Sequence, residues 1–211
     1  MITLHHLNHS RSQRILWLLE ELGVDYEIAA YQRDAKTRLA PPGLENIHPL
    51  GKSPVVTDGD LILHESGAIT AHLIRTYGDG KFAPAPSSDD FPEYLEWLHY
   101  AEGSAMLPLM LNLYVGRLGD AGAPLAPRID SETKRHFSFM NDEMKGKEFF
   151  VGESLTGADI MMSFPLDIAK ARGVLEPYAA LSGHVDKMRA RPAYQRAIEK
   201  GGEYSMGFFN R

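Results

Sequence analysis

The segment IHPLGKSPVVTDGDLILHES, residues 47–66, carries the clearest fold signal in the chain. Residues 54–57 and 61–64 are short apolar runs of strand length, and the Asp-Gly-Asp around Gly59 is typical of a tight turn. This pattern predicts a β-hairpin. A helical apolar pattern over residues 65–77 follows at once and ends at a glycine, so a helix is predicted directly after the second strand.

The residues before this hairpin predict a β-α-β unit. Residues 2–7 form a short apolar strand candidate. Apolar side chains between Ile15 and Leu22 then recur at helical spacing, and Gly23 ends that helix. A second strand is expected at residues 24–31, reached by a right-handed crossover. The first 80 residues are therefore predicted to fold as βαβ followed by ββα.

The rest of the chain is predicted to be helical. Residues 81–90 contain two prolines and small side chains without apolar periodicity, which indicates a linker. Helices are expected at residues 91–118, with a bend at Pro108, and at 128–144, from 156 onward, 177–191 and 192–200. Thr156 and Asp159 fit a capping box at the start of one of them. The tail from residue 201 carries Tyr204, Phe208 and Phe209.

Composition excludes several classes of function. The chain has 211 residues, a net charge of −6 and no cysteine, which argues against nucleic-acid partners, disulfide frameworks and thiol-based redox sites. Its nine histidines show no metal-ligand spacing. We find neither a targeting signal nor an apolar stretch long enough for a membrane span, and expect a cytoplasmic protein.

Three motifs, taken together and in this order, resemble those of the cytosolic glutathione transferases. They are PLGKSP at residues 49–54, HES at 64–66 and TGAD at 156–159. Within that family, the opening SRSQR at residues 10–14 and the segment at 47–54 are most similar to a bacterial and fungal branch. The resemblance covers essentially the whole chain. It implies a thioredoxin-like domain at residues 1–80, a linker at 81–90, an all-α domain at 91–211, and a homodimer.

The resemblance also implies a glutathione site in the first domain. Pro54 would follow a cis peptide bond and turn the main chain of Ser53 toward the peptide, while the side chain at 53 would matter little. Glu65 and Ser66 would bind the γ-glutamyl ammonium and carboxylate, and Lys52 the glycine carboxylate. Without the resemblance, Pro54 could simply begin a strand, Ser66 could cap a helix, and Lys52 could be solvated.

Catalysis would consist of stabilising the glutathione thiolate at the end of the first strand. The resemblance implies a serine, tyrosine or cysteine as the donor at this position. Because the chain lacks cysteine, we choose Ser10, with His9, Ser12 and Asn8 as alternatives. Counted back from Gly23 without gaps, the position of the family's hydroxyl residue falls on His9 instead. Ser10 also fits a capping box with the glutamine three residues later, which would make it a helix cap only.

The second substrate would bind on the helical domain. Tyr100, Leu107 and Met110 share one face of the expected long helix and suit a small hydrophobic electrophile, although core packing explains such a stripe equally well. The function predicted is conjugation of glutathione to such an electrophile, with no metal. The alternatives are a glutathione-dependent peroxidase and a non-catalytic binding module with the same fold.

Overall fold

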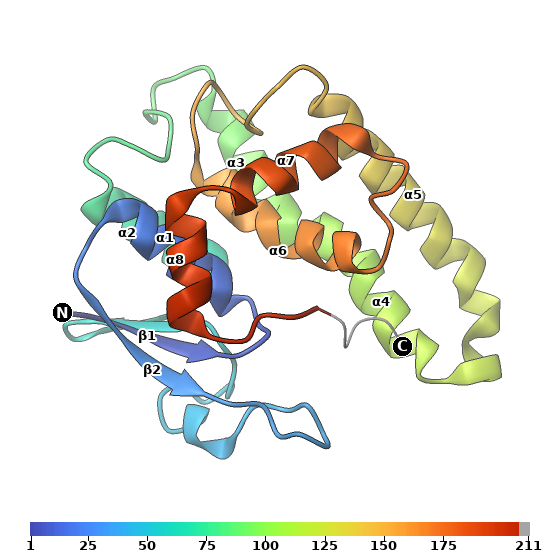
Figure 1. The fold of residues 1–211 in the computed structure, drawn as a ribbon, viewed down its shortest axis with the longest axis horizontal. Coiled ribbons are helices and arrows are strands. Elements are labelled where there is room, and N and C mark those ends of the chain that lie inside the picture. The colour runs from blue at the N-terminus through green and yellow to red at the C-terminus, as the bar shows by residue number, and fades with distance from the viewer. Residues whose placement is uncertain (207–211) are drawn as a thin grey trace. The chain divides into compact units, whose positions relative to one another are not determined.

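The computed structural model describes residues 1–206, which divide into two compact units (Figure 1). One unit contains Met1–Ala83 together with Arg189–Ser205, and the other contains Pro84–Met188 and Met206. The predicted tail residues Phe208 and Phe209 lie outside the described residues. No helix within residues 1–206 has the length and apolar character that crossing a membrane requires.

The first unit is built on a four-stranded sheet, as predicted. Its strands are β1 (Ile2–Leu7), β2 (Tyr26–Tyr31), β3 (Val55–Asp58) and β4 (Leu61–His64), in the order β2-β1-β3-β4. β1 pairs with β2 in parallel, whereas β3 pairs with β1 and β4 in antiparallel fashion. The helices of this unit are α1 (Ser12–Leu22), α2 (Ser66–Tyr77) and α8 (Pro192–Gly201). This is the thioredoxin-like arrangement that the sequence predicts.

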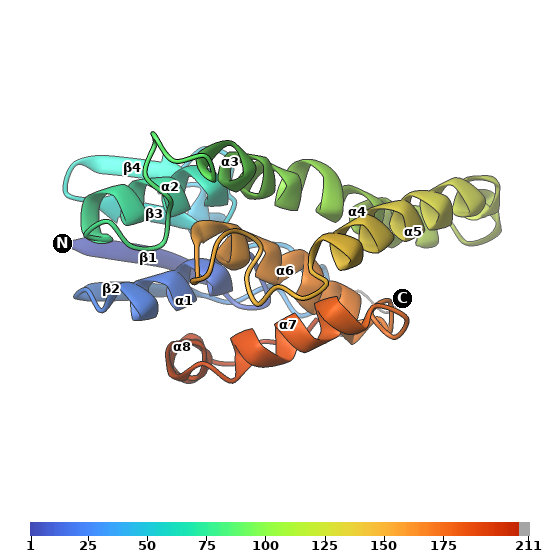
Figure 2. The same cartoon turned by 90° about the horizontal axis from the view of Figure 1, so that it is seen from above.

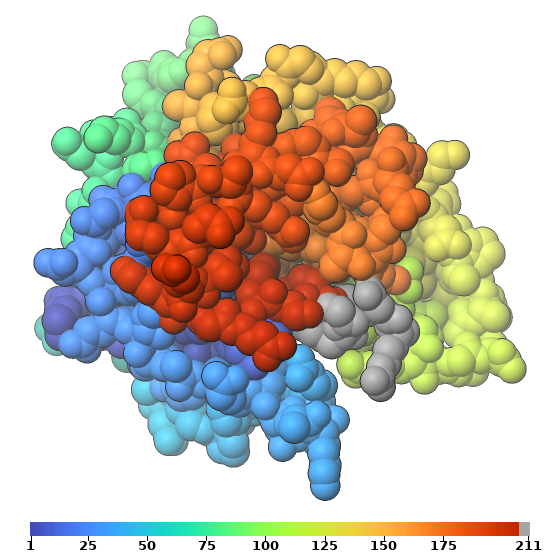
Figure 3. Space-filling view, in the orientation of Figure 1, coloured from blue at the N-terminus to red at the C-terminus, as the bar shows by residue number. Residues whose placement is uncertain are grey.

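Helix α8 returns from the end of the chain to pack on α1. Trp17 of α1 is fully buried and meets the ring of Tyr194 edge to face, with 5.3 Å between centroids. Figure 3 shows the red surface of this C-terminal segment lying over the blue N-terminal residues. The apolar residues of α1 are therefore covered by the sheet and also by α8, both within this unit. The domain boundaries predicted at residues 80 and 91 stay predictions.

Charged side chains reinforce the contact between α1 and α8. The Glu20 carboxylate is almost fully buried and accepts hydrogen bonds from Arg196 Nε at 2.7 Å, from Lys200 Nζ and from the Tyr26 hydroxyl. Arg191 forms a bidentate ion pair with Glu21 of α1, with N···O distances of 2.6 and 3.0 Å.

The second unit is helical, as expected. Figure 2 shows its helices, which are α3 (Phe91–Tyr100), α4 (Met106–Gly116), α5 (Ala126–Glu143), α6 (Gly157–Ala171) and α7 (Ala179–Arg189). The sequence predicts one helix over residues 91–118 with its bend at Pro108. Instead, a π-helical turn at Ala101–Ala105 separates α3 from α4. Pro108 has no N–H and its ring crowds the carbonyl of Ser104, so the irregularity falls one turn earlier.

The predicted capping box at α6 is confirmed. The Thr156 hydroxyl accepts from Ala158 N at 3.3 Å, and Asp159 Oδ2 accepts from Thr156 N at 2.9 Å. The other Asp159 oxygen accepts from Phe150 N at 2.9 Å. Burial raises the pKa of Asp159, although His184 beside it acts in the opposite direction. One buried carboxylate therefore joins the start of α6 to the loop before it.

Replacing Asp159 with alanine is expected to lower the free energy of unfolding by about 3 kcal/mol, because two buried backbone N–H groups lose their acceptor. Urea unfolding of the full chain measures this. Asp142→Ala removes an exposed carboxylate from a surface ion pair and should cost less than about 1 kcal/mol. Equal losses in the two variants would contradict the assigned role of Asp159.

Candidate functional site

Three segments meet at one end of the sheet. β1 and β3 pair up to His5 opposite Val55, and β3 and β4 pair up to Val55 opposite His64. The residues that follow β1, precede β3 and follow β4 therefore share the same sheet end. These positions include every predicted glutathione-site residue and the four candidate thiolate donors.

The β1–α1 turn is tightly folded and buried. His9 adopts a left-handed backbone conformation with φ of 50°, and it is buried together with Asn8 and Ser10. The capping box considered from the sequence does not form: the side-chain amide of Gln13 has no hydrogen-bond partner, and the N-cap position is Arg11, which provides no side-chain cap.

The two serine hydroxyls of this turn bond to one another and to the strand. Ser10 Oγ lies 2.8 Å from Ser12 Oγ and accepts from Ser12 N at 3.2 Å. Ser12 Oγ lies 2.9 Å from Nδ1 of His6 and 3.1 Å from the Leu7 carbonyl oxygen. Both hydroxyls therefore have partners inside the protein.

Asn8 presents a different arrangement. Its Oδ1 accepts from the backbone N–H of Arg33 at 2.8 Å, so the other side-chain atom, Nδ2, is the donor. That Nδ2 makes no hydrogen bond within residues 1–206. Asn8 thus has a fixed carboxamide whose donor side remains available.

Arg33 holds this turn in place. Its guanidinium donates to the carbonyl oxygens of Asn8 at 3.1 Å, Arg38 at 2.8 Å and His9 at 3.5 Å. Sequence reasoning missed this residue, since a lone arginine in an irregular charged stretch carries no signal that its partners are backbone carbonyls some 25 residues away.

His9 is engaged by the segment after α8. Its Nδ1 accepts from Ser205 N at 2.9 Å, so in the neutral ring Nε2 carries the proton, 3.9 Å from a carboxylate oxygen of Glu203. Burial lowers the pKa of His9, with Glu203 opposing that shift. The neutral imidazole therefore directs its N–H toward an exposed glutamate.

The Ser53–Pro54 peptide bond is cis, as the resemblance implied. No backbone hydrogen bond joins the main chain of Ser53 to the other described residues. The Ser53 hydroxyl donates to the His5 carbonyl at 2.9 Å and accepts from Leu7 N at 3.3 Å, so this side chain has a structural role in the unit. That it matters little to the bound peptide stays a prediction. Pro54 has no N–H and cannot donate to β1. The Ser53 hydroxyl makes hydrogen bonds to the backbone of β1 beside it.

The start of α2 has unpaired donors. Ser66 is the first helical residue and is buried, yet its hydroxyl has no partner in the described chain, so it is not the helix cap considered from the sequence. Glu65 precedes it at φ of 68°, is exposed and makes no capping bond. The first backbone bond of this helix runs from Ile69 N to Glu65 O, which leaves the earlier N–H groups without acceptors among residues 1–206. Lys52 is exposed on the neighbouring loop.

The predicted electrophile residues lie in the second unit, on two helices rather than one. Tyr100 ends α3, and its hydroxyl lies 2.6 Å from His136 Nδ1; burial raises the pKa of this tyrosine to about 12. Leu107 is 53% exposed on α4, and Met110 is half-buried there. Their role stays a prediction.

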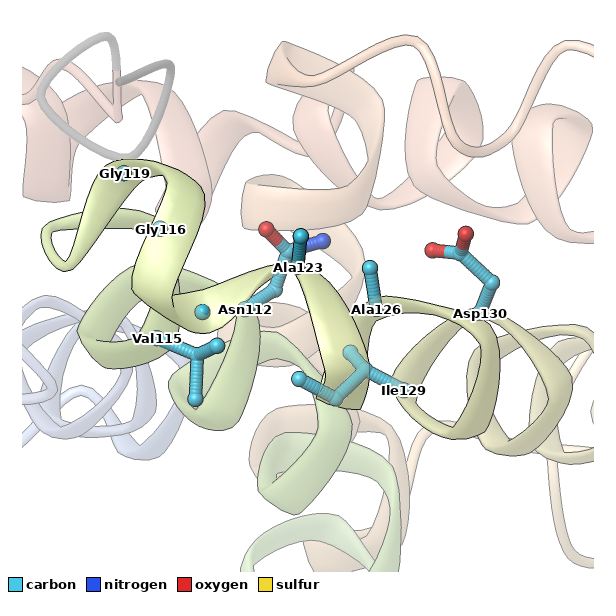
Figure 4. A pocket seen from close by; sticks show the side chains of 9 residues that line it. Asn112, Val115, Gly116, Gly119, Ala123, Ala126, Ile129 and Asp130 are labelled. Atoms are coloured by element: carbon cyan, nitrogen blue, oxygen red, sulfur yellow. The ribbon is translucent and has the colours of Figure 1, made fainter.

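The second unit also contains a small cavity of about 200 Å³ (Figure 4). It lies where α4 ends and α5 begins, and its lining is Asn112, Val115, Gly116, Gly119, Gly122, Ala123, Ala126, Ile129 and Asp130. None of the predicted site residues lines it. Among the described residues there is no group of three or more potential metal-ligating side chains.

Two family models match the chain. The model "Glutathione S-transferase, N-terminal domain" matches residues 1–75, and "Glutathione S-transferase, C-terminal domain" matches residues 104–192. Together they span more than half of the sequence, in the order that the sequence motifs predict.

Individual proteins agree with these models. The chain is 35% identical to glutathione S-transferase 1 of Saccharomyces cerevisiae over 95% of each protein. It is 36% identical to a glutathione S-transferase of Actinobacillus pleuropneumoniae, whose crystal structure matches with a TM-score of 0.89 over 99% of both chains. A sphingomonad glutathione S-transferase complexed with glutathione shares the fold, with a TM-score of 0.76 over 95% of this chain and 98% of that one, at 23% identity. The chain belongs to the glutathione S-transferase family.

Proposed function

We propose that this chain is a glutathione transferase that converts bound glutathione to its thiolate and adds it to small hydrophobic electrophiles. The observation that carries the proposal is the set of donors without protein partners at one sheet end: the first turn of α2, the main chain of Ser53 and the carboxamide of Asn8. A cysteine-containing tripeptide needs contacts of these kinds.

Each part of glutathione has a chemically suitable group. The γ-glutamyl carboxylate would accept from Ser66 and the α2 N-terminus, and its ammonium would pair with Glu65. The cysteinyl main chain would pair with Ser53 beside cis-Pro54, and the glycine carboxylate would attract Lys52. The glutathione bound by the sphingomonad relative supports glutathione as the ligand.

Thiolate stabilisation is assigned within the β1–α1 turn. A free thiol has a pKa of about 8.5, and lowering it by about two units requires roughly 2.7 kcal/mol. One hydrogen bond to a charged sulfur contributes about 1.5–3 kcal/mol. The sequence favours Ser10 as the donor, but its hydroxyl already has Ser12 Oγ and Ser12 N as partners within the protein, so the hydrogen bonds support Asn8 Nδ2 instead. The imidazole of His9 is a weaker choice because it faces Glu203.

The electrophile would bind against Tyr100, Leu107 and Met110, completing a two-domain enzyme with the boundaries predicted at residues 80 and 91. We further expect a homodimer. Peroxide reduction by the same thiolate is the competing activity, and glutathione binding without turnover is the competing non-enzymatic role.

Calorimetry of the chain with glutathione tests the proposal first, and an ultraviolet titration of the bound thiolate tests it second. Tight binding with a lowered thiol pKa, followed by turnover of a chlorodinitrobenzene, supports the transferase. Absence of glutathione binding refutes every version of it. Binding with an unshifted thiol pKa favours the binding module, and turnover of an organic hydroperoxide alone favours the peroxidase.

Ser66→Ala is expected to weaken glutathione binding by about ten- to a hundredfold, because the ligand's carboxylate loses a charge-assisted hydrogen bond. Thr76→Ala, at the opposite end of the same helix, is the matched control and should leave the dissociation constant within about twofold. Calorimetry compares the two. Equal affinities for the two variants would remove Ser66 from the site.

A further inference from the structure

His6 is a buried residue that no part of the proposed site uses so far. It is the next-to-last residue of β1, and both of its ring nitrogens have partners. Nε2 lies 3.1 Å from the carbonyl oxygen of Gly201, at the end of α8, and Nδ1 lies 2.9 Å from Ser12 Oγ. Burial lowers the pKa of His6 to about 4, so the ring is neutral at physiological pH.

Gly201, His6, Ser12 and Ser10 are linked by a series of hydrogen bonds, and the Gly201 carbonyl determines which group donates in each of them. A carbonyl only accepts, so the proton of the neutral His6 ring is on Nε2, and Nδ1 must accept. Ser12 has one hydroxyl proton, which faces two acceptors, His6 Nδ1 and the Leu7 carbonyl. Ser12 Oγ therefore accepts in its 2.8 Å contact with Ser10, and the proton of Ser10 faces inward.

Gly201 packs closely against this contact. An added Cβ would lie 2.8 Å from both Gln13 Oε1 and Leu16 Cδ2 and 3.2 Å from His6 Nε2. A side chain at this position would therefore force these neighbouring side chains to move. Figure 1 shows this end of α8 beside β1 and α1.

His6 is unsuited to act as a base toward the thiol. Its pKa of about 4 lies more than four units below the pKa of about 8.5 of a free thiol, so moving the thiol proton to the ring is unfavourable by more than about ten-thousandfold. Its contribution must come from the hydrogen bonds that it orders.

We propose that His6 is a positioning residue for thiolate formation, a role that rests on the proposed function. It fixes Ser12 at the first position of α1 and thereby the turn that presents Asn8. It also keeps the Ser10 hydroxyl directed at Ser12, so that the sulfur faces the Asn8 carboxamide.

Two variants separate the two bonds of the ring. His6→Asn places Oδ1 near the position of Nδ1 and can keep the bond to Ser12 while losing the bond to Gly201. His6→Gln places Nε2 near the ring's Nε2 and can keep the bond to Gly201 while losing the bond to Ser12. Circular dichroism and urea unfolding establish that both variants are folded.

In the complex with glutathione, His6→Gln is expected to raise the thiol pKa by about one unit, from about 6.5 to about 7.5, and so to lower kcat at neutral pH about threefold. His6→Asn should keep the thiol pKa within about 0.3 units of wild type. The dissociation constant of glutathione, measured at acidic pH where the thiol is protonated, should stay within about twofold in both, because the peptide's other contacts are untouched.

Equal shifts of the thiol pKa in the two variants, or no shift in either, would overturn the positioning role. So would a change in acidic-pH affinity that matches the change in kcat, because that indicates a general structural effect. Wild type serves to separate the two proposals. If the wild-type protein fails to bind glutathione, both the proposed function and the role of His6 are refuted. If it binds glutathione and lowers the thiol pKa, but the two variants do not show the expected difference in thiol pKa, only the role of His6 is refuted.

Discussion

Replacing Asn8 with alanine is expected to raise the pKa of the thiol of bound glutathione by about one to two units, whereas Ser10→Ala should change it by less than about half a unit. Asn8 Nδ2 is a fixed donor without a protein partner, and its removal costs the thiolate a charge-assisted hydrogen bond. The hydroxyl of Ser10 already has a partner at 2.8 Å in Ser12 Oγ. Ultraviolet titration of each complex measures the thiol pKa.

The kinetic consequence of Asn8→Ala follows from the same change. At neutral pH the thiolate fraction falls, and kcat/KM for the electrophile should fall by about three- to twenty-five-fold. Asn46→Ala, an exposed asparagine of the same unit, is the control and should be unchanged. A larger pKa rise in Ser10→Ala than in Asn8→Ala would return the donor role to Ser10, the residue that the sequence favours.

The second large effect is expected in the contact between α1 and α8. The double variant Arg196→Met/Lys200→Met leaves the buried Glu20 carboxylate without a cation and should lower the free energy of unfolding by about 3–5 kcal/mol. Glu20→Gln should cost less, because the two cations are about half exposed and can be rehydrated. Urea unfolding of the full chain provides the comparison.

The matched control for this double variant is Arg128→Met/Lys145→Met, which removes two cations from exposed ion pairs of the second unit. Its loss should stay within about 1 kcal/mol. If Glu20→Gln lost more stability than Arg196→Met/Lys200→Met, the other hydrogen bonds of the carboxylate, and not its pairing with the two cations, would dominate its contribution to the free energy of unfolding.

The pH dependence of this contact has a defined direction. Burial by itself raises the pKa of Glu20, but hydrogen bonds from Lys200, Tyr26 and Arg196 outweigh it and hold the pKa at about 2, below the usual 4.5. Because the folded-state pKa is depressed, the stabilisation is present above pH 4.5 and is lost as the pH falls toward 2. In the double variant this acid-dependent loss should shrink.

Features that depend on neighbouring residues were predictable from the sequence. The hairpin around Gly59 and the capping box of Thr156 and Asp159 each result from a few adjacent residues with strong local preferences. The identity of the family followed from motifs of the same local kind. The bend expected at Pro108 was displaced by one turn, because the proline acts on the carbonyl that precedes it by four residues.

Features that depend on distant residues were not predictable in this way. The Arg33 contacts to the β1–α1 turn span about 25 residues, and the bond from His6 to Gly201 spans 195. Whether a serine or an asparagine can donate to a ligand depends on the partners that its side chain already has, which here are Ser12 for Ser10 and Arg33 N for Asn8. A list of residue types at the end of β1 contains no such information.

The return of α8 to the first unit has a consequence for biosynthesis. The side chains of α1 that meet α8 leave the ribosome long before their covering helix is made. At about 5–20 residues per second, the roughly 170 residues between α1 and α8 take on the order of 10–35 s. During that interval the first unit is incomplete, with the apolar surface around Trp17 uncovered, and it can close only after α8 has been made.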